Sequence, residues 1–282
     1  MTVEDLLFFA KQHIHSDHAK ILIAELLNCN PLELLNHLQE EVSNEKIELL
    51  KKEIKALEEN KPLQYVLGYV NFYGNKFVVD ERVLIPRFET EELVENTIKY
   101  IKKLFTEPVD IIDLGCGSGV IGITLEKKVS TKTVDLIDIS KEALEVAKIN
   151  CEKLNSKCNL IQSDMFENVE KKYDVIISNP PYIKENEIIE DIVKENEPHL
   201  ALYAGKDGLD CYKKILETVN EYKKEKCIIA FEIGYQQAED IKRLVDKYIP
   251  KAQVIIKKDL SDKDRMAFIF CGIKENEIMW IK

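Results

Sequence analysis

Apolar residues are spaced as in helices throughout the first part of this 282-residue chain. Leu6, Leu7 and Ala10 recur at the i, i+3, i+4 interval that gives a helix one apolar face. A second, charged helix is predicted over residues 44–59. This region contains no group of side chains suited to catalysis. The pattern therefore predicts a small helical bundle over residues 1–60 that serves as an interaction or lid module.

The pattern changes between residues 61 and 87, where aromatic and β-branched residues alternate around Gly68 and Gly74. Such alternation, interrupted by turn residues, predicts a β-hairpin that links the bundle to the rest of the chain. An amphipathic helix is predicted to follow over residues 88–105.

From residue 109 onward, short apolar runs alternate with amphipathic segments, which is typical of an α/β domain with a mostly parallel sheet. We expect this domain to occupy residues 88–282. Its last two strands should pair antiparallel, because the loop between them is too short for a crossover helix. The predicted strands are residues 109–114, 133–137, 159–162, 173–178, 227–232, 252–257 and 266–271. The predicted helices are residues 120–127, 141–154, 209–225 and 235–248.

Bulk properties exclude several classes of protein. No apolar run approaches the ~18 residues that span a bilayer, and the acidic start does not resemble a signal peptide, so we expect a cytoplasmic protein without membrane contact. The seven cysteines form no C-x-x-C pair, and His13, His15 and His18 do not share a helix face, so neither disulfides nor a metal site are expected. The net charge of −11 disfavours a protein whose main task is to grip DNA.

Candidate chemistry begins with the segment Asp113–Gly119, which reads DLGCGSG and follows the first predicted strand. Glycines permit a tight turn and a close ligand approach at this edge of an open sheet. Two interpretations stay open from the segment alone. The G-x-G-x-x-G spacing that ends at Gly122 matches the dinucleotide-binding fingerprint. Gly115 and Asp113 instead complete the D-x-G-x-G-x-G loop of S-adenosylmethionine-dependent methyltransferases, in which Asp113 would accept hydrogen bonds from the loop and the cofactor. Cys116 is expected to be a small filler.

Two acidic residues follow the next predicted strands. Asp138 lies about 20 residues after the glycines, where a carboxylate accepts both hydroxyls of a ribose. Ser140 already caps the following helix, which leaves Asp138 available for this role. Both kinds of cofactor carry a ribose, so Asp138 does not separate them. Asp164 is predicted to accept hydrogen bonds from the amino group of an adenine, with Met165 and Phe166 packing on its ring. The alternative interpretation is that Met165 and Phe166 belong to the apolar core.

The segment Asn179-Pro180-Pro181-Tyr182 after the fourth predicted strand decides between the two cofactors. Neither proline has an N–H, and Pro181 holds Pro180 extended, so the carbonyl oxygens of this turn are left as acceptors. With the side-chain oxygen of Asn179 they form a cradle for the two N–H bonds of a planar –NH2 group. A dehydrogenase has no use for this cradle, whereas a methyltransferase that acts on an amino or amide nitrogen needs one. The sequence therefore favours S-adenosylmethionine.

Further segments resemble the protein-(glutamine-N5) methyltransferases that modify class 1 peptide-chain release factors, the HemK/PrmC-type enzymes. The resemblance covers about residues 61–272 and includes the glycine loop and Ser178–Ile183. The other matching segments are Pro62–Gly68, Phe72–Gly74, Val83–Glu91, Glu197–Leu202, Asp207–Leu209, Glu232–Gly234 and Asp259–Arg265. Two positions depart from the family pattern: Phe88 replaces a usual proline, and Met165 stands where some members carry an aromatic residue.

The resemblance implies a Rossmann-like methyltransferase sheet, mostly parallel with an antiparallel final strand, after a small helical domain. It implies methyl transfer from S-adenosylmethionine to the glutamine side chain of the Gly-Gly-Gln motif of release factors, which the helical domain helps to dock. We expect a monomer. The implied catalytic and substrate-binding residues are Asn179, Pro180, Pro181 and Tyr182. The predicted cofactor-binding residues are Asp113, Gly115, Cys116, Gly117, Ser118, Gly119, Asp138, Asp164, Met165 and Asn179.

Two alternative substrates use the same Asn-Pro-Pro-Tyr core. A glutamine of a large-subunit ribosomal protein is one, although we then expect a different segment in place of residues 87–92. A DNA adenine is the other, because the cradle also accepts a flipped base. The acidic charge and the lack of a segment large enough for a target-recognition domain count against DNA. The complete set of loop, acid and Asn-Pro-Pro-Tyr residues disfavours an inactive scaffold.

Overall fold

The computed structural model describes residues 1–278, and in it the chain divides into two compact units. The first unit consists of Met1–Tyr69 with the short segment Glu190–Asn196, and the second of Val70–Ile189 with the residues from Glu197 onward. The predicted functional division, with boundaries after residues 60 and 87, stays a prediction. Residues 279–282, at the end of the predicted 88–282 domain, lie outside the described residues.

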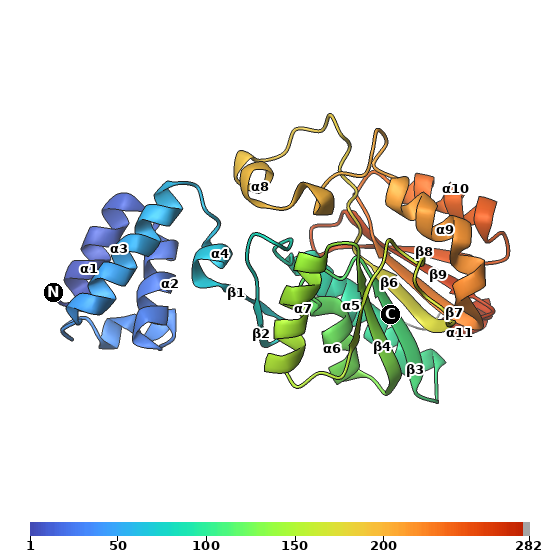
Figure 1. The fold of residues 1–282 in the computed structure, drawn as a ribbon, viewed down its shortest axis with the longest axis horizontal. Helices are drawn as coiled ribbons and strands as arrows, with labels where there is room; N and C mark the ends of the chain where they lie inside the picture. Colours follow the sequence, from blue (N-terminus) through green and yellow to red (C-terminus); the bar gives the residue numbers. More distant parts are fainter. Residues whose placement is uncertain (279–282) are drawn as a thin grey trace. The chain divides into compact units, whose positions relative to one another are not determined.

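The first unit is helical, as the apolar spacing predicts (Figure 1). Leu6, Leu22 and Leu50 belong to its shared apolar core. The first helix begins where Thr2 and Asp5 form a reciprocal capping box, which satisfies backbone N–H groups that the helix itself leaves free. Its helices are α1 (Val3–His13), α2 (Ser16–Leu27), η1 (Pro31–Asn36), α3 (Asn44–Glu58), α4 (Leu63–Leu67) and α8 (Asp191–Asn196).

Part of the predicted hairpin linker is helical, so the prediction of a hairpin over all of residues 61–87 was wrong. Gly68, interpreted as a turn between strands, has a φ of 74° and ends α4 as a left-handed cap. The hairpin itself consists of β1 (Tyr69–Phe72) and β2 (Asn75–Val78).

A seven-stranded sheet in the order β5-β4-β3-β6-β7-β9-β8 is the framework of the second unit. The first five strands of this order pair in parallel, and β9 runs antiparallel to both β7 and β8. The predicted mostly parallel sheet with an antiparallel final strand is thereby confirmed. The strands are β3 (Val109–Leu114), β4 (Thr131–Asp138), β5 (Asn159–Gln162), β6 (Tyr173–Ser178), β7 (Lys223–Glu232), β8 (Gln253–Lys258) and β9 (Asp264–Cys271).

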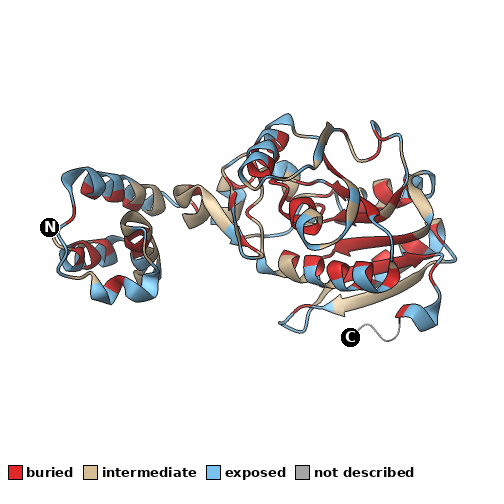
Figure 2. Cartoon of the chain, turned by 90° about the horizontal axis from the view of Figure 1, so that it is seen from below, coloured by how far each residue is buried: buried red, intermediate tan, exposed pale blue. Residues whose placement is uncertain are grey.

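Helices cover both faces of this sheet, and the strands form the buried interior of the second unit (Figure 2). Because side chains alternate along a strand, Ile111 packs into one core and Ile112 into the other. The helices of the first core are α5 (Phe88–Leu104), α6 (Val120–Lys128) and α7 (Lys141–Lys153), and those of the second are α9 (Asp210–Tyr222) and α10 (Ala238–Tyr248). The two short remaining helices are η2 (His199–Ala201) and α11 (Glu275–Ile278).

Several predicted boundaries in this unit were wrong. The strand expected over residues 227–232 begins at Lys223, and the helix expected over residues 235–248 begins at Ala238. The helix expected over residues 209–225 ends at Tyr222, because Lys223 already pairs with Tyr173 of β6 as the first residue of β7. Within the described residues, no helix is both long and apolar enough to span a lipid bilayer.

Candidate active site

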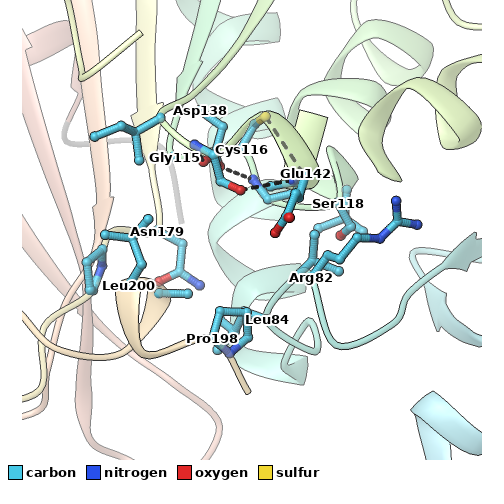
Figure 3. A pocket seen from close by; sticks show the side chains of 18 of the residues that line it. Arg82, Leu84, Gly115, Cys116, Ser118, Asp138, Glu142, Asn179, Pro198 and Leu200 are labelled. Carbon is cyan, nitrogen blue, oxygen red and sulfur yellow. Dashed lines mark hydrogen bonds between the residues drawn. The ribbon is translucent and has the colours of Figure 1, made fainter. Parts of the chain in front are cut away.

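A cavity of about 460 Å³ lies at the carboxyl edge of the sheet, within the size range of small-molecule sites. Here α6 follows β3 onto one face, and the chain after β6 leads to α9 on the other face. Such a divergence of connections leaves a crevice at the sheet edge. Figure 3 shows some of the lining side chains, among them Leu84, Gly115, Asp138, Asn179, Pro198 and Leu200.

The glycine loop forms one wall of the cavity. Gly115 and Gly117 both have positive φ values, and a Cβ atom on either would meet no protein atom within 4 Å. The space beside both backbones is therefore open to a ligand. The loop leads into α6 at Val120, which also lines the cavity, so the partial positive charge of a helix N-terminus lies at this wall.

Gly122 of α6 has a packing function instead. A Cβ atom at this position would lie 2.2 Å from Cδ2 of Leu136 on β4, so no larger residue fits without displacement. This glycine accounts for the G-x-G-x-x-G spacing that also matched the dinucleotide fingerprint, without requiring a dinucleotide.

Asn150 of α7 ties the glycine loop to the hairpin. Its fully buried side-chain amide donates to the carbonyls of Ser118 (2.9 Å) and Val78 (3.0 Å). Its oxygen accepts from the N–H of Val78 (2.7 Å). The position of the loop therefore depends on a strand forty residues before it in the chain.

Asp113 lies beneath the loop and is not among the residues that line the cavity. Its Oδ2 accepts from the N–H of Gly122 (2.9 Å), and its Oδ1 is buried without a hydrogen-bond partner among the described residues. Burial, reinforced by the charge of Asp138, raises the pKa of this carboxyl to about 7. Its predicted contact with a cofactor stays a prediction.

Asp138 lines the cavity at the end of β4. Its two carboxylate oxygens accept from the N–H groups of Gly117 and Ser140, each at 2.9 Å, while burial raises its pKa. Each oxygen keeps a second lone pair for a ligand hydroxyl. Ser140 caps α7 by accepting from Ala143 (3.1 Å), which confirms the cap that the sequence predicted.

The segment after β5 is divided between the cavity and the core. Asp164 and Met165 line the cavity, and Asp164 lies 2.5 Å from the ammonium group of Lys214 on α9. Phe166 is buried and stacks on Tyr222 with ring centroids 4.4 Å apart. The prediction that Phe166 packs on a bound ring was wrong, because its ring belongs to the apolar core under α9.

Three further predicted residues of the glycine loop are Cys116, Ser118 and Gly119. Cys116 lines the cavity, and burial raises the pKa of its thiol far above the ordinary value, so the thiol stays protonated as expected of a filler. Ser118 also lines the cavity, whereas Gly119 does not.

Asn179 and Pro181 line the cavity from the end of β6. In the sheet register, Asp113 of β3 lies opposite Ile177 of β6, so the two motifs leave their strands at the same level. Ser178 holds these strand ends together by donating to the carbonyl of Leu114 (2.6 Å). Pro180 and Tyr182 are not among the lining residues, and the carbonyl of Tyr182 accepts from Gln237 (3.2 Å).

Thr90 and Glu232 continue the hydrogen bonds of this wall. Both lie in segments that match the family, Val83–Glu91 and Glu232–Gly234, but neither is among the predicted site residues. Asn179 donates through Nδ2 to Oγ1 of Thr90 (3.1 Å), and Thr90 donates to Oε2 of Glu232 (2.7 Å). Burial raises the pKa of Glu232 to about 7. The available signal was an acidic residue at the end of a third strand, since Glu232 closes β7.

A buried acid also connects two segments at the rim. Glu197 accepts from the guanidinium of Arg87 (2.5 Å) and the N–H of Ile85 (3.2 Å). It thereby links two parts of the cavity wall, one within residues 81–90 and the other within residues 198–201. Phe88, the departure from the family pattern, is exposed and does not line the cavity.

Curated relatives decide the family. A release factor glutamine methyltransferase of Bacillus cereus is 40% identical over 255 residues, which cover 88% of this chain and 90% of that protein. The chain belongs to the release factor glutamine methyltransferase family. Another member of the family, from Streptococcus pneumoniae, is 38% identical over 93% of this chain and 94% of its own. The resemblance found in the motifs is thereby confirmed.

Family models agree with this membership, and solved structures show the fold. The PrmC N-terminal domain matches residues 8–68 and the methyltransferase small domain matches residues 88–203. A methyltransferase from Pyrococcus furiosus superposes with a TM-score of 0.51 at 18% identity, covering 79% of this chain and 98% of that one. The T. thermophilus 16S rRNA N2 G1207 methyltransferase, in complex with AdoMet and guanosine, superposes with a TM-score of 0.51 at 13% identity. The match covers 72% of this chain and 49% of that one. At such identities these two structures show a common fold with this member of the release factor glutamine methyltransferase family.

Proposed function

We propose that this protein transfers a methyl group from S-adenosylmethionine to the side-chain amide nitrogen of the glutamine in the Gly-Gly-Gln motif of class 1 peptide-chain release factors. The observation that carries the proposal is that Asn179 and the glycine loop line one cavity. Relatives named as release factor glutamine methyltransferases, about 40% identical over most of the chain, support the choice of substrate.

The lining residues fit S-adenosylmethionine. Gly115 and Gly117 leave open space beside the backbone, and Asp138 retains lone pairs suited to ribose hydroxyls. Met165 would pack beside the adenine, and Asp164 would accept from its amino group. When bound, the cofactor supplies an electrophilic methyl group on a positively charged sulfur, and the neutral thioether is a good leaving group.

The residues of the chain then hold and orient the substrate amide. Oδ1 of Asn179 and the carbonyl of Pro180 would each accept one N–H bond, which directs the nitrogen lone pair toward the methyl group. An amide nitrogen is a weak nucleophile because its lone pair is delocalised. Acceptors that favour a pyramidal nitrogen with developing positive charge stabilise the transition state more than the ground state. Orientation alone contributes up to ~7–11 kcal/mol in ideal cases.

The helical first unit is proposed to dock the release factor. Phe8, Leu32 and Leu35 are exposed on it and can be buried against a protein surface. All proposed site residues come from the second unit of one chain, so a monomer suffices for the site. We propose that it acts in the cytoplasm.

Methyl transfer from labelled S-adenosylmethionine to three substrates in parallel tests the proposal. The substrates are an intact release factor, its Gly-Gly-Ala variant and unmethylated DNA. We expect label on the intact release factor alone. Label on DNA would assign base methylation instead, and label on none of them despite cofactor binding would indicate the ribosomal-protein substrate or an inactive scaffold.

A further inference from the structure

A chain of hydrogen bonds runs from Asn179 away from the cavity into the protein. Asn179 donates to Thr90, Thr90 donates to Oε2 of Glu232, and the hydroxyl of Tyr182 donates to Oε1 of the same carboxylate (3.5 Å). Thr90 and Glu232 are each 2% exposed, so the bond between them is shielded from bulk water. The three elements involved are the first turn of α5, the end of β7 and the segment after β6.

We propose that Thr90 and Glu232 are positioning residues that fix which way the Asn179 amide faces. They hold its –NH2 against the protein and leave its oxygen for the substrate. This inference rests on the proposed function and deepens it, because it explains how a neutral amide keeps its oxygen, and not its –NH2 group, turned toward the substrate.

The number of hydrogens available along this chain of bonds fixes the orientation of the Asn179 amide. An asparagine amide has nearly the same shape in its two flipped orientations, so packing alone discriminates weakly between them. An ionised carboxylate only accepts, so Glu232 takes the single hydrogen of the Thr90 hydroxyl. The oxygen of Thr90 can then only accept from Asn179, which must turn its –NH2 toward Thr90. A flipped Asn179 would present an –NH2 group to the –NH2 group of the substrate, and both would lack acceptors.

The charge of Glu232 therefore sets the polarity of the cradle. The groups around it are Thr90 and Glu89 of α5, Tyr182 after β6 and Arg265 of β9. Burial raises the pKa of Glu232 to about 7, and the negative charge of Glu89 also raises it. Hydrogen bonds from Thr90 and Tyr182 and the positive charge of Arg265 lower it. A protonated Glu232 can donate to Thr90, whose hydrogen is then free to point at Asn179 and stabilise the flipped amide. Methyl transfer should accordingly fall as the pH falls through this pKa.

Variants of Thr90 and Glu232 test the inference in the full-length protein, with the intact release factor as substrate. Thr90→Val keeps the shape but loses the relay, and we expect kcat to fall by about tenfold or more, a smaller loss than the ~10²–10³ of removing a group that contacts the transition state. Thr90→Ser should keep most of the activity because it restores the hydroxyl. Glu232→Gln should flatten the pH profile, which in the unmodified protein has a midpoint near the pKa of about 7.

Thr97→Val is a matched control. Thr97 is also fully buried on α5, but its hydroxyl donates to the carbonyl of Leu93 (2.7 Å) in its own helix. It should leave kcat and the pH profile unchanged. Thermal unfolding and cofactor binding of each variant show whether it is folded. Unchanged kcat in folded Thr90→Val, or an unchanged pH profile in folded Glu232→Gln, would overturn the inference.

A second readout does not depend on catalysis. The side-chain –NH2 resonances of Asn179 in 15N-labelled protein should shift between pH 6 and 8.5, and Glu232→Gln should abolish that shift. If the release factor is not methylated but the resonances titrate as expected, the substrate assignment fails while the orienting role of Glu232 stands. If the resonances do not titrate, the orienting role fails whatever the substrate.

Discussion

The two walls of the cavity are built in different ways. The glycine loop and Asp138 come from consecutive strand ends, and the backbone N–H groups of Gly117 in the loop and of Ser140 hold the carboxylate in place. The opposite wall depends on side chains from α5, β6 and β7, and a relay of hydroxyl and carboxylate groups orients Asn179. The first wall should therefore tolerate changes that preserve its backbone geometry and the Asp138 carboxylate, whereas the second should fail when a single hydrogen-bonding atom is lost.

Removing the side chain of Asn179 should have the largest effect. Asn179→Ala deletes the substrate acceptor but no group of the glycine loop, so we expect methyl transfer to fall by about 10²–10³. Cofactor affinity, measured by calorimetry, should change little. Asn220→Ala, which alters an exposed asparagine on α9, is the control. Retained methylation by Asn179→Ala would refute the proposed cradle.

Replacing Asp138 should instead weaken cofactor binding. Asp138→Ala leaves the N–H groups of Gly117 and Ser140 without their carboxylate and removes the proposed ribose acceptor. Charge-assisted hydrogen bonds contribute ~1.5–3 kcal/mol each, so cofactor affinity should fall by at least about tenfold. Calorimetric titration measures this. If affinity is unchanged and only kcat falls, the distinction between the two walls is wrong.

A change under the first wall should affect stability. Gly122→Ala places a Cβ atom 2.2 Å from Leu136, and overpacking typically costs ~1–3 kcal/mol. Scanning calorimetry should show a Tm lower by several degrees. Combining it with Leu136→Ala removes the clashing methyl group, so the two losses should be less than additive. Strict additivity would show that the close contact is not the cause.

The smallest effect concerns pH and Asp113. Its pKa is raised to about 7 in the folded protein, so the folded state binds more protons than the unfolded state between pH 4 and 7. Stability from this group is therefore present at acidic pH and lost as the pH rises through 7. Asp113→Asn should raise the Tm most at pH 8 relative to the unmodified protein, and this gain should shrink progressively as the pH falls from 7 toward 4.

Asp110 provides a control of opposite sign for that experiment. Burial acts against its ionised form, but hydrogen bonds from Lys224 and Thr133 outweigh burial and lower its pKa. Its stabilisation is present above pH 4 and lost as the pH falls further, so Asp110→Asn should lower the Tm at neutral pH. The same pH trend in both variants would contradict the assigned causes.

The first wall could be predicted from the sequence because its signals are local. The Asp113–Gly119 segment and Asp138 each lie at the end of a strand whose apolar run is visible, and parallel strands bring their carboxyl ends to one edge. The Asn179–Tyr182 segment was found in the same way. All but Asp113, Gly119, Pro180 and Tyr182 among the predicted site residues line the cavity.

The partners of Asn179 could not be found in this way. Thr90 lies 89 residues before Asn179, and Glu232 lies 142 residues after Thr90. Periodicity identifies the helix and the strand that carry them but not which helix start faces which strand end. Phe166 illustrates a related limit, since an aromatic residue beside a predicted site is equally compatible with the core, where its ring stacks on Tyr222.

The three hydrogen bonds of Asn150 have a consequence for local opening of the protein. Because one buried side chain serves both Val78 and Ser118, opening of the glycine loop leaves a buried Asn150 N–H without its acceptor and weakens the hold of Asn150 on the edge of β2. We therefore expect the two segments to open together in native-state hydrogen exchange, with the N–H of Val78 reporting on the loop. A ligand that closes the loop would slow exchange in the hairpin without touching it.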